Sequence, residues 1–118
     1  MPTRVEQSAL RQILSGKTSA DQTFSQNVWA VTARIPKGSV ATYSQVAKAL
    51  KCRSYRAVGT ALHRNPYAPQ VPCHRVVGSD GRLVGFAYGL DAKRHLLEQE
   101  GIVLQNGRVD LDRYGCEL

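Results

Sequence analysis

A chain of 118 residues, 42% of them hydrophobic, is long enough for one domain with a single modest core. Its 16 lysine and arginine residues against 9 acidic residues give a formal net charge of +7. This excess favours a polyanionic partner, nucleic acid first, over a merely solvated basic surface. No apolar run reaches the roughly 20 residues that span a bilayer, and no signal-peptide core or basic amphipathic helix is present. A soluble intracellular protein without membrane contact is therefore expected.

The N-terminal stretch is polar and weakly periodic. Residues 1–22 are expected to form an extension, with a short helix around Ser8 to Leu14 and a linker after it. Residues 23–118 are expected to form one folded domain. The three cysteines of the chain are widely spaced and make no CxxC pair, so neither a disulfide framework nor a metal site is expected.

The helical pattern sharpens after this extension. In FSQNVWAVTARI the apolar positions suit one face of a helix over 24–35. Asp21 or Thr23 can cap its start, and the PKG sequence at 36–38 ends it.

Two further helices are predicted close together. Thr42 and Gln45 form a capping-box pattern that predicts a helix over 42–50. A short connector, KCRS, leads to a second helix over 55–65 with apolar residues on one side. Two short helices joined by such a turn are typical of a helix-turn-helix, although many small helical domains have the same pattern.

The second of these helices is rich in small residues: Ala57, Gly59, Thr60 and Ala61. A helix that reads the major groove usually presents long polar side chains to the bases, and here Arg56 is the one long side chain at the helix start. Small residues allow close approach of the helix backbone to a ligand. They are also typical of tight packing against another helix, and composition alone leaves both interpretations open.

The rest of the chain is expected to form a proline-punctuated loop, a short strand, a glycine-rich loop, a helix and a small hairpin, in the order 65–72, 73–77, 78–89, 90–100 and 102–111. Gly101 is a helix C-cap, and Asn106-Gly107 is a typical hairpin turn. The predicted fold is therefore mainly α: a helix-turn-helix, winged-helix-like core with a short active-site strand and a C-terminal helix.

The run VPCHRVV contains the candidate nucleophile, Cys73. Thiolate is the reactive form, and a free thiol with a pKa of about 8.5 needs a nearby base or cation. His74 is adjacent, but neighbouring side chains point apart in an extended segment, so a water would have to relay the proton. An imidazole in this role needs a third group on its other nitrogen, and Glu98 and Glu100 are candidates. The residues alone leave open a plain buried thiol.

An ordered set of motifs extends this interpretation. RAVG, NP, PCHRV, a glycine–aromatic–x–x–glycine and K-x-x-LLxxEG follow one another between about Phe24 and Gly101. In this order they closely resemble the active-site domain of the O6-alkylguanine-DNA alkyltransferases, the methylated-DNA–protein-cysteine methyltransferases. The resemblance covers roughly two-thirds of the chain.

The resemblance implies a direct and irreversible transfer of the alkyl group from O6 of guanine to Cys73, with no cofactor and no metal. His74, acting through a water, would be the base, and Glu100 the carboxylate that orients it. Asn65 would brace the turn between the recognition helix and the active-site strand.

The resemblance also implies how DNA is held. The second helix would lie in the minor groove, with Ala57 and Gly59 against the DNA. Arg56 would fill the space left by the flipped nucleotide, and Tyr43 would press on the adjacent phosphate. The substrate would be double-stranded DNA containing O6-alkylguanine.

The implied substrate pocket contains two departures from the family pattern. Val76, Phe86, Ala87 and Tyr88 would form the pocket. Phe86 replaces a tyrosine whose hydroxyl donates a hydrogen bond to O6, and losing such a donor slows transfer. Tyr88 replaces a small residue and is expected to narrow the mouth. The family's N-terminal domain is also expected to be absent.

The tail GRVDLDRY resembles the alkyltransferase-like proteins, which bind alkylated DNA without transfer and have tryptophan in place of the cysteine. The sequence therefore predicts a monomeric DNA-repair methyltransferase, cytoplasmic and nucleoid-associated in a prokaryote and nuclear in a eukaryote. The alternative is a sensor that recruits other repair proteins. A helix-turn-helix regulator with a structural cysteine ranks last, because it has no use for the active-site motifs.

Overall fold

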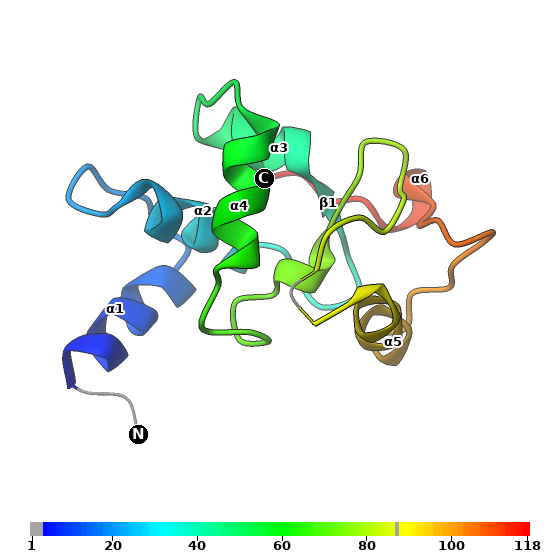
Figure 1. Ribbon diagram of the computed structural model, residues 1–118, viewed down its shortest axis with the longest axis horizontal. Helices are drawn as coiled ribbons and strands as arrows, with labels where there is room; N and C mark the ends of the chain where they lie inside the picture. The colour runs from blue at the N-terminus through cyan, green and yellow to red at the C-terminus, as the bar shows by residue number, and fades with distance from the viewer. Residues whose placement is uncertain (1–3, 87) are drawn as a thin grey trace.

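The computed structural model describes residues 4–86 and 88–118 (Figure 1). Its elements in chain order are α1 (Arg4–Leu14), α2 (Phe24–Ala33), β1 (Ala41–Thr42), α3 (Tyr43–Ala49), α4 (Tyr55–His63), the 3-10 helix η1 (Cys73–Arg75), β2 (Val76–Val77), α5 (Leu90–Gln99) and α6 (Leu111–Tyr114). In Figure 1, α1 and α2 lie at one end of the long axis and α5 and α6 at the other, with α3 and α4 between them. The predicted small, mainly helical fold is confirmed. No helix among the described residues is long and apolar enough to cross a membrane.

Side-chain caps set where the central helices begin. Thr23 and Gln26 make a capping box at the start of α2, and Thr42 and Gln45 make another at the start of α3. Each box satisfies backbone N–H groups that the first turn of a helix leaves without partners. Ser54 caps α4 by accepting a hydrogen bond from the backbone N–H of Ala57. Local side-chain chemistry therefore determines where each of these three helices begins.

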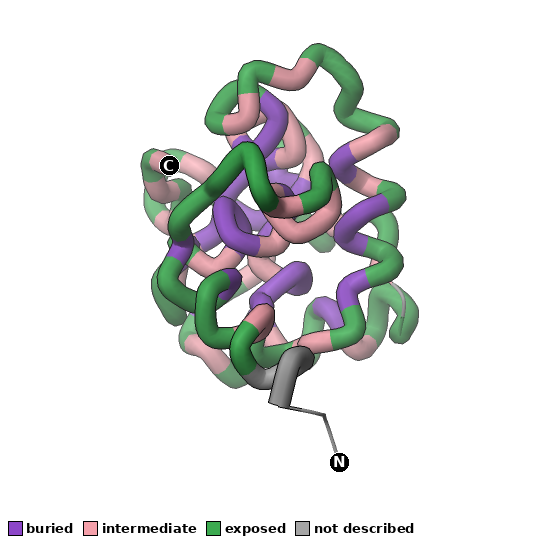
Figure 2. The backbone as a smooth tube through the Cα atoms, turned by 90° about the vertical axis from the view of Figure 1, so that its left-hand side faces the viewer, coloured by how far each residue is buried: buried purple, intermediate pink, exposed green. Residues whose placement is uncertain are grey.

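Helices α2, α3 and α4 pack around the main hydrophobic core. Its buried residues include Val28 and Val31 from α2, Val46 from α3 and Val58 from α4. The indole N–H of Trp29 donates to the carbonyl of Ala61 at 2.8 Å, which fixes α2 against α4. In Figure 2 the buried segments, drawn in purple, lie inside a shell of exposed loops and helix faces.

A short parallel pair, β1 with β2, links the helix-turn-helix to the cysteine segment, and Ala41 pairs with Val76. Residues on the other side of this pair form a second core with α5 and the tail: Val40, Val77, Leu97, Ile102 and Val109. The C-terminal segment returns to the start of β1, where the backbone of Val40 bonds to Tyr114 and Cys116. The cysteine segment therefore lies between two cores.

Three predicted elements differ in detail from the structure. The segment 73–77 is not one strand, because Cys73–Arg75 form a 3-10 turn and only Val76–Val77 are extended. The N-terminal helix begins at Arg4, packs on α2 and buries Ile13 completely. The predicted turn is present at Asn106-Gly107, with both residues at positive φ, but α6 follows it without having been expected.

Candidate active site

Cys73 is the first residue of η1 and follows the fixed backbone of Pro72. Its backbone N–H donates to the carbonyl of Val71, and the N–H of Arg75 donates to that of Pro72, both at 2.9 Å. The side chain is buried in the main core, with 6% of its surface exposed. This tight turn fixes the thiol between the helix-turn-helix and α5.

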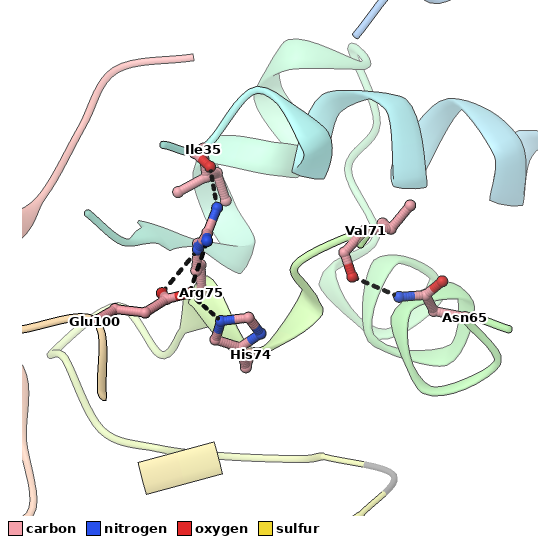
Figure 3. A network of polar contacts seen from close by, with 6 residues as sticks. All are labelled: Ile35, Asn65, Val71, His74, Arg75 and Glu100. Carbon is pink, nitrogen blue, oxygen red and sulfur yellow. Dashed lines mark hydrogen bonds and ion pairs between the residues drawn. The ribbon is translucent and has the colours of Figure 1, made fainter. Parts of the chain in front are cut away.

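His74, Arg75 and Glu100 form one polar network beside the cysteine (Figure 3). The Nε2–H of His74 and the guanidinium of Arg75 both donate to Oε2 of Glu100, at 3.1 and 2.7 Å. Arg75 also donates to Oε1 of Glu100 at 2.9 Å and to the carbonyl of Ile35 at 2.8 Å. The carboxylate is therefore held by a bidentate pair, which also fixes the histidine ring.

The second ring nitrogen of His74 is the unusual atom of this network. The side chain is 1% exposed, and Nδ1 is buried without a hydrogen-bond partner among the described residues. Since Nε2 carries the proton that bonds to the carboxylate, Nδ1 of a neutral ring is an acceptor. Buried polar atoms normally find a partner, so a free acceptor here is suited to receiving a proton.

Burial and charge set the protonation states of the three groups. Burial raises the pKa of the Cys73 thiol, although the Asn65 amide and the Lys93 ammonium act in the opposite direction. Burial lowers the pKa of His74, and its bond to Glu100 offsets this only in part. Burial also opposes ionisation of Glu100, but hydrogen bonds from Arg75 and His74 outweigh it and lower the pKa of the carboxyl. At neutral pH the site rests as thiol, neutral imidazole and carboxylate.

Asn65 ties the end of α4 to the residues before the cysteine. Its Nδ2 donates to the carbonyl of Val71 at 2.9 Å (Figure 3), and its Oδ1 accepts from the N–H of Tyr67 at 2.9 Å. The side chain is buried, so both bonds are shielded from water. These two bonds tie the loop before Cys73 to the end of α4, and a role of Asn65 in the reaction stays a prediction.

Lys93 is a functional candidate that the sequence analysis did not select. Its side chain is fully buried, and its ammonium donates to the carbonyls of Val84 at 2.9 Å and Gly85 at 3.4 Å. Burial lowers the pKa of Lys93 to about 8, although the nearby Cys73 acts in the opposite direction. The signal in the sequence was a lysine on the apolar face of the helix 90–100. Arg75, the other residue missed, is a charged residue inside an apolar run.

Tyr43 meets the same loop from α3. Its hydroxyl donates to the carbonyl of Val84 at 2.7 Å, and the ammonium of Lys93 lies 5.7 Å from its ring centre. Burial and the neighbouring Cys73 raise the pKa of Tyr43 to about 12. Tyr43 and Lys93 therefore hold the backbone at 84–85 from two sides.

An open cavity of about 850 Å³ lies between α3, α4 and the loop 79–85. Tyr43, Arg56 and Gly59, three of the predicted DNA-binding residues, line it together. Ala57 lies instead in a second hollow on the other side of α4, which Arg56 also lines. A Cβ added at Gly59 would meet nothing within 4 Å, so no neighbour in the protein requires this glycine.

The predicted pocket residues are placed differently from one another. Val76 is fully buried in the main core, and Phe86 is half-buried against the same core. Tyr88 is 66% exposed and packs edge-on against Phe86, with ring centres 5.5 Å apart. Ala87 lies outside the described residues. That Tyr88 narrows the pocket mouth stays a prediction.

Among the described residues, no group of three or more histidine, cysteine, aspartate or glutamate residues could hold a metal ion. A helix-turn-helix joined to a buried cysteine with a histidine–carboxylate pair defines the class of the domain: a DNA-binding fold with a candidate nucleophile. Residues 23–102 match the family described as 6-O-methylguanine DNA methyltransferase, DNA binding domain, and the chain belongs to this family.

Relatives and solved structures agree with this assignment. A methylated-DNA–protein-cysteine methyltransferase of Methanosarcina barkeri is 51% identical over 78 residues, which cover 65% of this chain and 49% of that protein. A structure of Atl1 of S. pombe in complex with damaged DNA containing O6-carboxymethylguanine matches 80% of this chain and 95% of its own, with 27% identity and a TM-score of 0.72.

A third match comes from Mycobacterium tuberculosis. OGT of that organism, in complex with DNA, matches 79% of this chain and 63% of its own, with 35% identity and a TM-score of 0.65. The chain spans about half the length of the curated relatives it matches.

Proposed function

We propose that the protein repairs O6-alkylguanine in double-stranded DNA by moving the alkyl group to Cys73, once and irreversibly. The observation that carries the proposal is the bond from His74 Nε2 to Glu100, which leaves Nδ1 as a buried acceptor on the residue that follows the cysteine. A buried structural thiol has no use for such a pair. The chemistry needs no metal and no cofactor.

The transfer is a displacement at the alkyl carbon. The thiol gives its proton, through a water, to Nδ1 of His74, and the sulfur forms a bond to the alkyl carbon as the carbon–O6 bond breaks. Guanine leaves with the electron pair of that bond and takes up a proton at N1 from water, while the His74 imidazolium returns its proton to water. The products are S-alkylcysteine and guanine in DNA, and the protein does not turn over.

The protonation states of Cys73, His74 and Glu100 in the free protein support this mechanism. Because burial raises the pKa of Cys73, little thiolate exists at neutral pH, which keeps the thiol from side reactions. Because burial lowers the pKa of His74, the imidazole is neutral and ready to accept a proton. Glu100 stays ionised and stabilises the imidazolium that forms. Lys93 adds a positive charge that favours the thiolate while the proton is in transit.

Access to a base inside a duplex requires flipping, and the residues around the open cavity are suited to it. Gly59 costs helix stability, about 1 kcal/mol relative to alanine, with no gain in packing, so its small size favours close approach of DNA to α4. Arg56 would occupy the gap left by the flipped nucleotide, and Tyr43 would direct the neighbouring phosphate. Ala57 and Gly59 would face the minor groove.

Because the substrate is DNA, it determines where the protein would act. The protein would act as a monomer in the compartment that holds DNA: the cytoplasm, at the nucleoid, of a prokaryote or the nucleus of a eukaryote. The formal charge of +7 supports phosphate contacts, so affinity for DNA should fall steeply as salt rises. An affinity that does not change with salt concentration would mean that the basic residues do not contact DNA phosphates.

Two observations favour an alternative function, that of a sensor of damaged DNA. Phe86 provides no hydroxyl toward the departing guanine, and the chain matches nearly the whole of Atl1, which was crystallised with damaged DNA. A sensor would flip and hold O6-alkylguanine and recruit other repair proteins without transfer. The presence of Cys73 beside His74 favours transfer over this alternative.

The direct test follows the DNA. A duplex with one O6-methylguanine is incubated with excess protein, and the nucleosides are separated after digestion. Transfer predicts that O6-methylguanine is replaced by guanine in a single turnover and that Cys73→Ser abolishes this. Tight binding with the lesion intact would establish the sensor instead. Equal affinity for damaged and undamaged DNA, together with an intact lesion, would reject both.

A further inference from the structure

Tyr55 is the first residue of α4 and lines the large cavity between α3, α4 and the loop 79–85. Its side chain is 60% exposed, and the described residues provide it with neither a hydrogen bond nor an aromatic neighbour. The position is nevertheless rigid, since Ser54 caps the helix and Trp29 fixes it to α2. An ordered helix therefore presents an aromatic ring to solvent.

The neighbours of Tyr55 indicate what this ring meets. Tyr55, Gly59 and His63 recur at intervals of four, so they share one face of α4, and all three line the cavity. Gly59 makes the helix surface flat beside the ring, with open space where its side chain would be. A single exposed aromatic residue needs no explanation. Tyr55, however, lies beside a glycine that no packing contact requires, in a hollow that Arg56 also lines. Such a surface is suited to a flat apolar partner.

The position of Tyr55 also differs from that of Arg56. Arg56 lines the hollows on both sides of α4, whereas Tyr55 lines only the one shared with Tyr43 and Gly85. The two side chains diverge because adjacent residues of a helix do not face each other. They would therefore occupy different places against a bound duplex.

We propose that Tyr55 is a second wedge for base flipping: its ring stacks on the base pair next to the lesion, on the side of the loop 79–85, while Arg56 fills the gap. The proposal rests on the proposed function, because only a flipped nucleotide exposes the face of its neighbour. An aromatic side chain that stacks on an exposed base offsets part of the lost stacking, which an aliphatic side chain does less well. Tyr55 thereby contributes to the preference for damaged DNA.

The test measures the affinity of the intact protein for two duplexes that differ only in one O6-methylguanine. Tyr55→Ala is expected to weaken binding to the damaged duplex about tenfold and binding to the undamaged duplex less than about twofold, since base–aromatic stacking is lost only where a base is flipped. Tyr55→Phe keeps the ring and should retain the preference, whereas Tyr55→Leu should lose most of it. Val103→Ala, which shortens a similarly exposed side chain on the tail, is the matched control and should change neither affinity.

The outcomes separate this proposal from the transfer reaction. An equal loss on both duplexes would make Tyr55 an ordinary groove contact, and no loss on either would remove it from the interface; both overturn the wedge. If the wild-type protein binds the damaged duplex selectively but transfers nothing, the proposed enzyme fails while the Tyr55 test still gives its result. A change in the number of protein copies per duplex, with unchanged preference, would assign the ring to protein–protein contact and also overturn the proposal.

Discussion

His74 donates a hydrogen bond from Nε2 to Glu100 at 3.1 Å, and this contact determines the tautomer of the ring. Nδ1 is left as a buried acceptor without a partner among the described residues. The same carboxylate is held by Arg75 through both of its oxygens. The orientation and the basicity of the His74 ring therefore depend on residues from two elements, η1 and the end of α5, which are far apart in the sequence.

Replacement of His74 by alanine should change the pH profile of transfer. In the wild type, neutral His74 can take the thiol proton at any pH above its lowered pKa and below the raised pKa of Cys73, so the rate should be nearly level between these limits. Without the base only preformed thiolate reacts, so the His74→Ala rate should rise about tenfold per pH unit up to the thiol pKa. Single-turnover transfer measured across this range is the check. Parallel profiles for the two proteins would exclude His74 as the base.

Arg75 should matter through Glu100. In Arg75→Lys one ammonium replaces a guanidinium that makes two bonds to Glu100 and one to Ile35. The free energy of unfolding should fall by about 1–3 kcal/mol, because a point charge cannot reproduce the bidentate pair. Urea denaturation measures the loss. Transfer should slow less than in His74→Ala and keep its wild-type pH profile, and an altered profile would mean that Arg75 acts on the proton itself.

Lys93 should make stability depend on pH. Its pKa in the folded protein, about 8, lies below the ordinary value of 10.5, so the unfolded chain binds more protons between these two values. The free energy of unfolding of the wild type should therefore rise with pH in this interval, relative to Lys93→Met, by up to about 1.4 kcal/mol per pH unit. Urea denaturation of both proteins between about pH 8 and 10 gives the difference. A difference that does not change with pH would contradict a lowered pKa.

Phe86→Tyr should accelerate transfer. A hydroxyl added at this ring can donate to O6 as negative charge develops there, so a gain of at least about tenfold in the single-turnover rate is expected. Phe24→Tyr adds the same hydroxyl to the other phenylalanine of the chain, on α2, and should change the rate less than about twofold. Equal rates for Phe86→Tyr and the wild type would show that the pocket does not use a donor at this position.

Local signals predicted the framework well. The capping pattern of Thr42 and Gln45 and the apolar periodicity of residues 55–65 were enough to place the helix-turn-helix. The run 73–77 is predicted as one strand because it lies in a short apolar stretch that ends in two valines. Pro72 and the bond from Arg75 N–H to its carbonyl instead turn the first three residues into a 3-10 helix. A single turn of this kind leaves no periodic signal.

The site was predicted less completely. The residues alone left Glu98 and Glu100 open, and the choice of Glu100 came from the family resemblance. In the structure Glu98 pairs with Arg94 at 3.5 Å on the exposed face of α5, while Glu100 reaches His74. The spacing predicts Lys93 only as part of a helical repeat, because its burial depends on how the irregular loop before α5 folds back onto the helix. The path of such a loop leaves no periodic signal in the sequence.

The central claim is that Cys73 accepts the alkyl group, and the mass of the protein tests it most directly. Protein incubated with an excess of duplex containing O6-methylguanine is weighed intact and then digested to locate any change. The account predicts a gain of one methylene group per chain, on the peptide that contains Cys73, and no gain in Cys73→Ala. An unchanged mass of a protein that binds the damaged duplex tightly would contradict it.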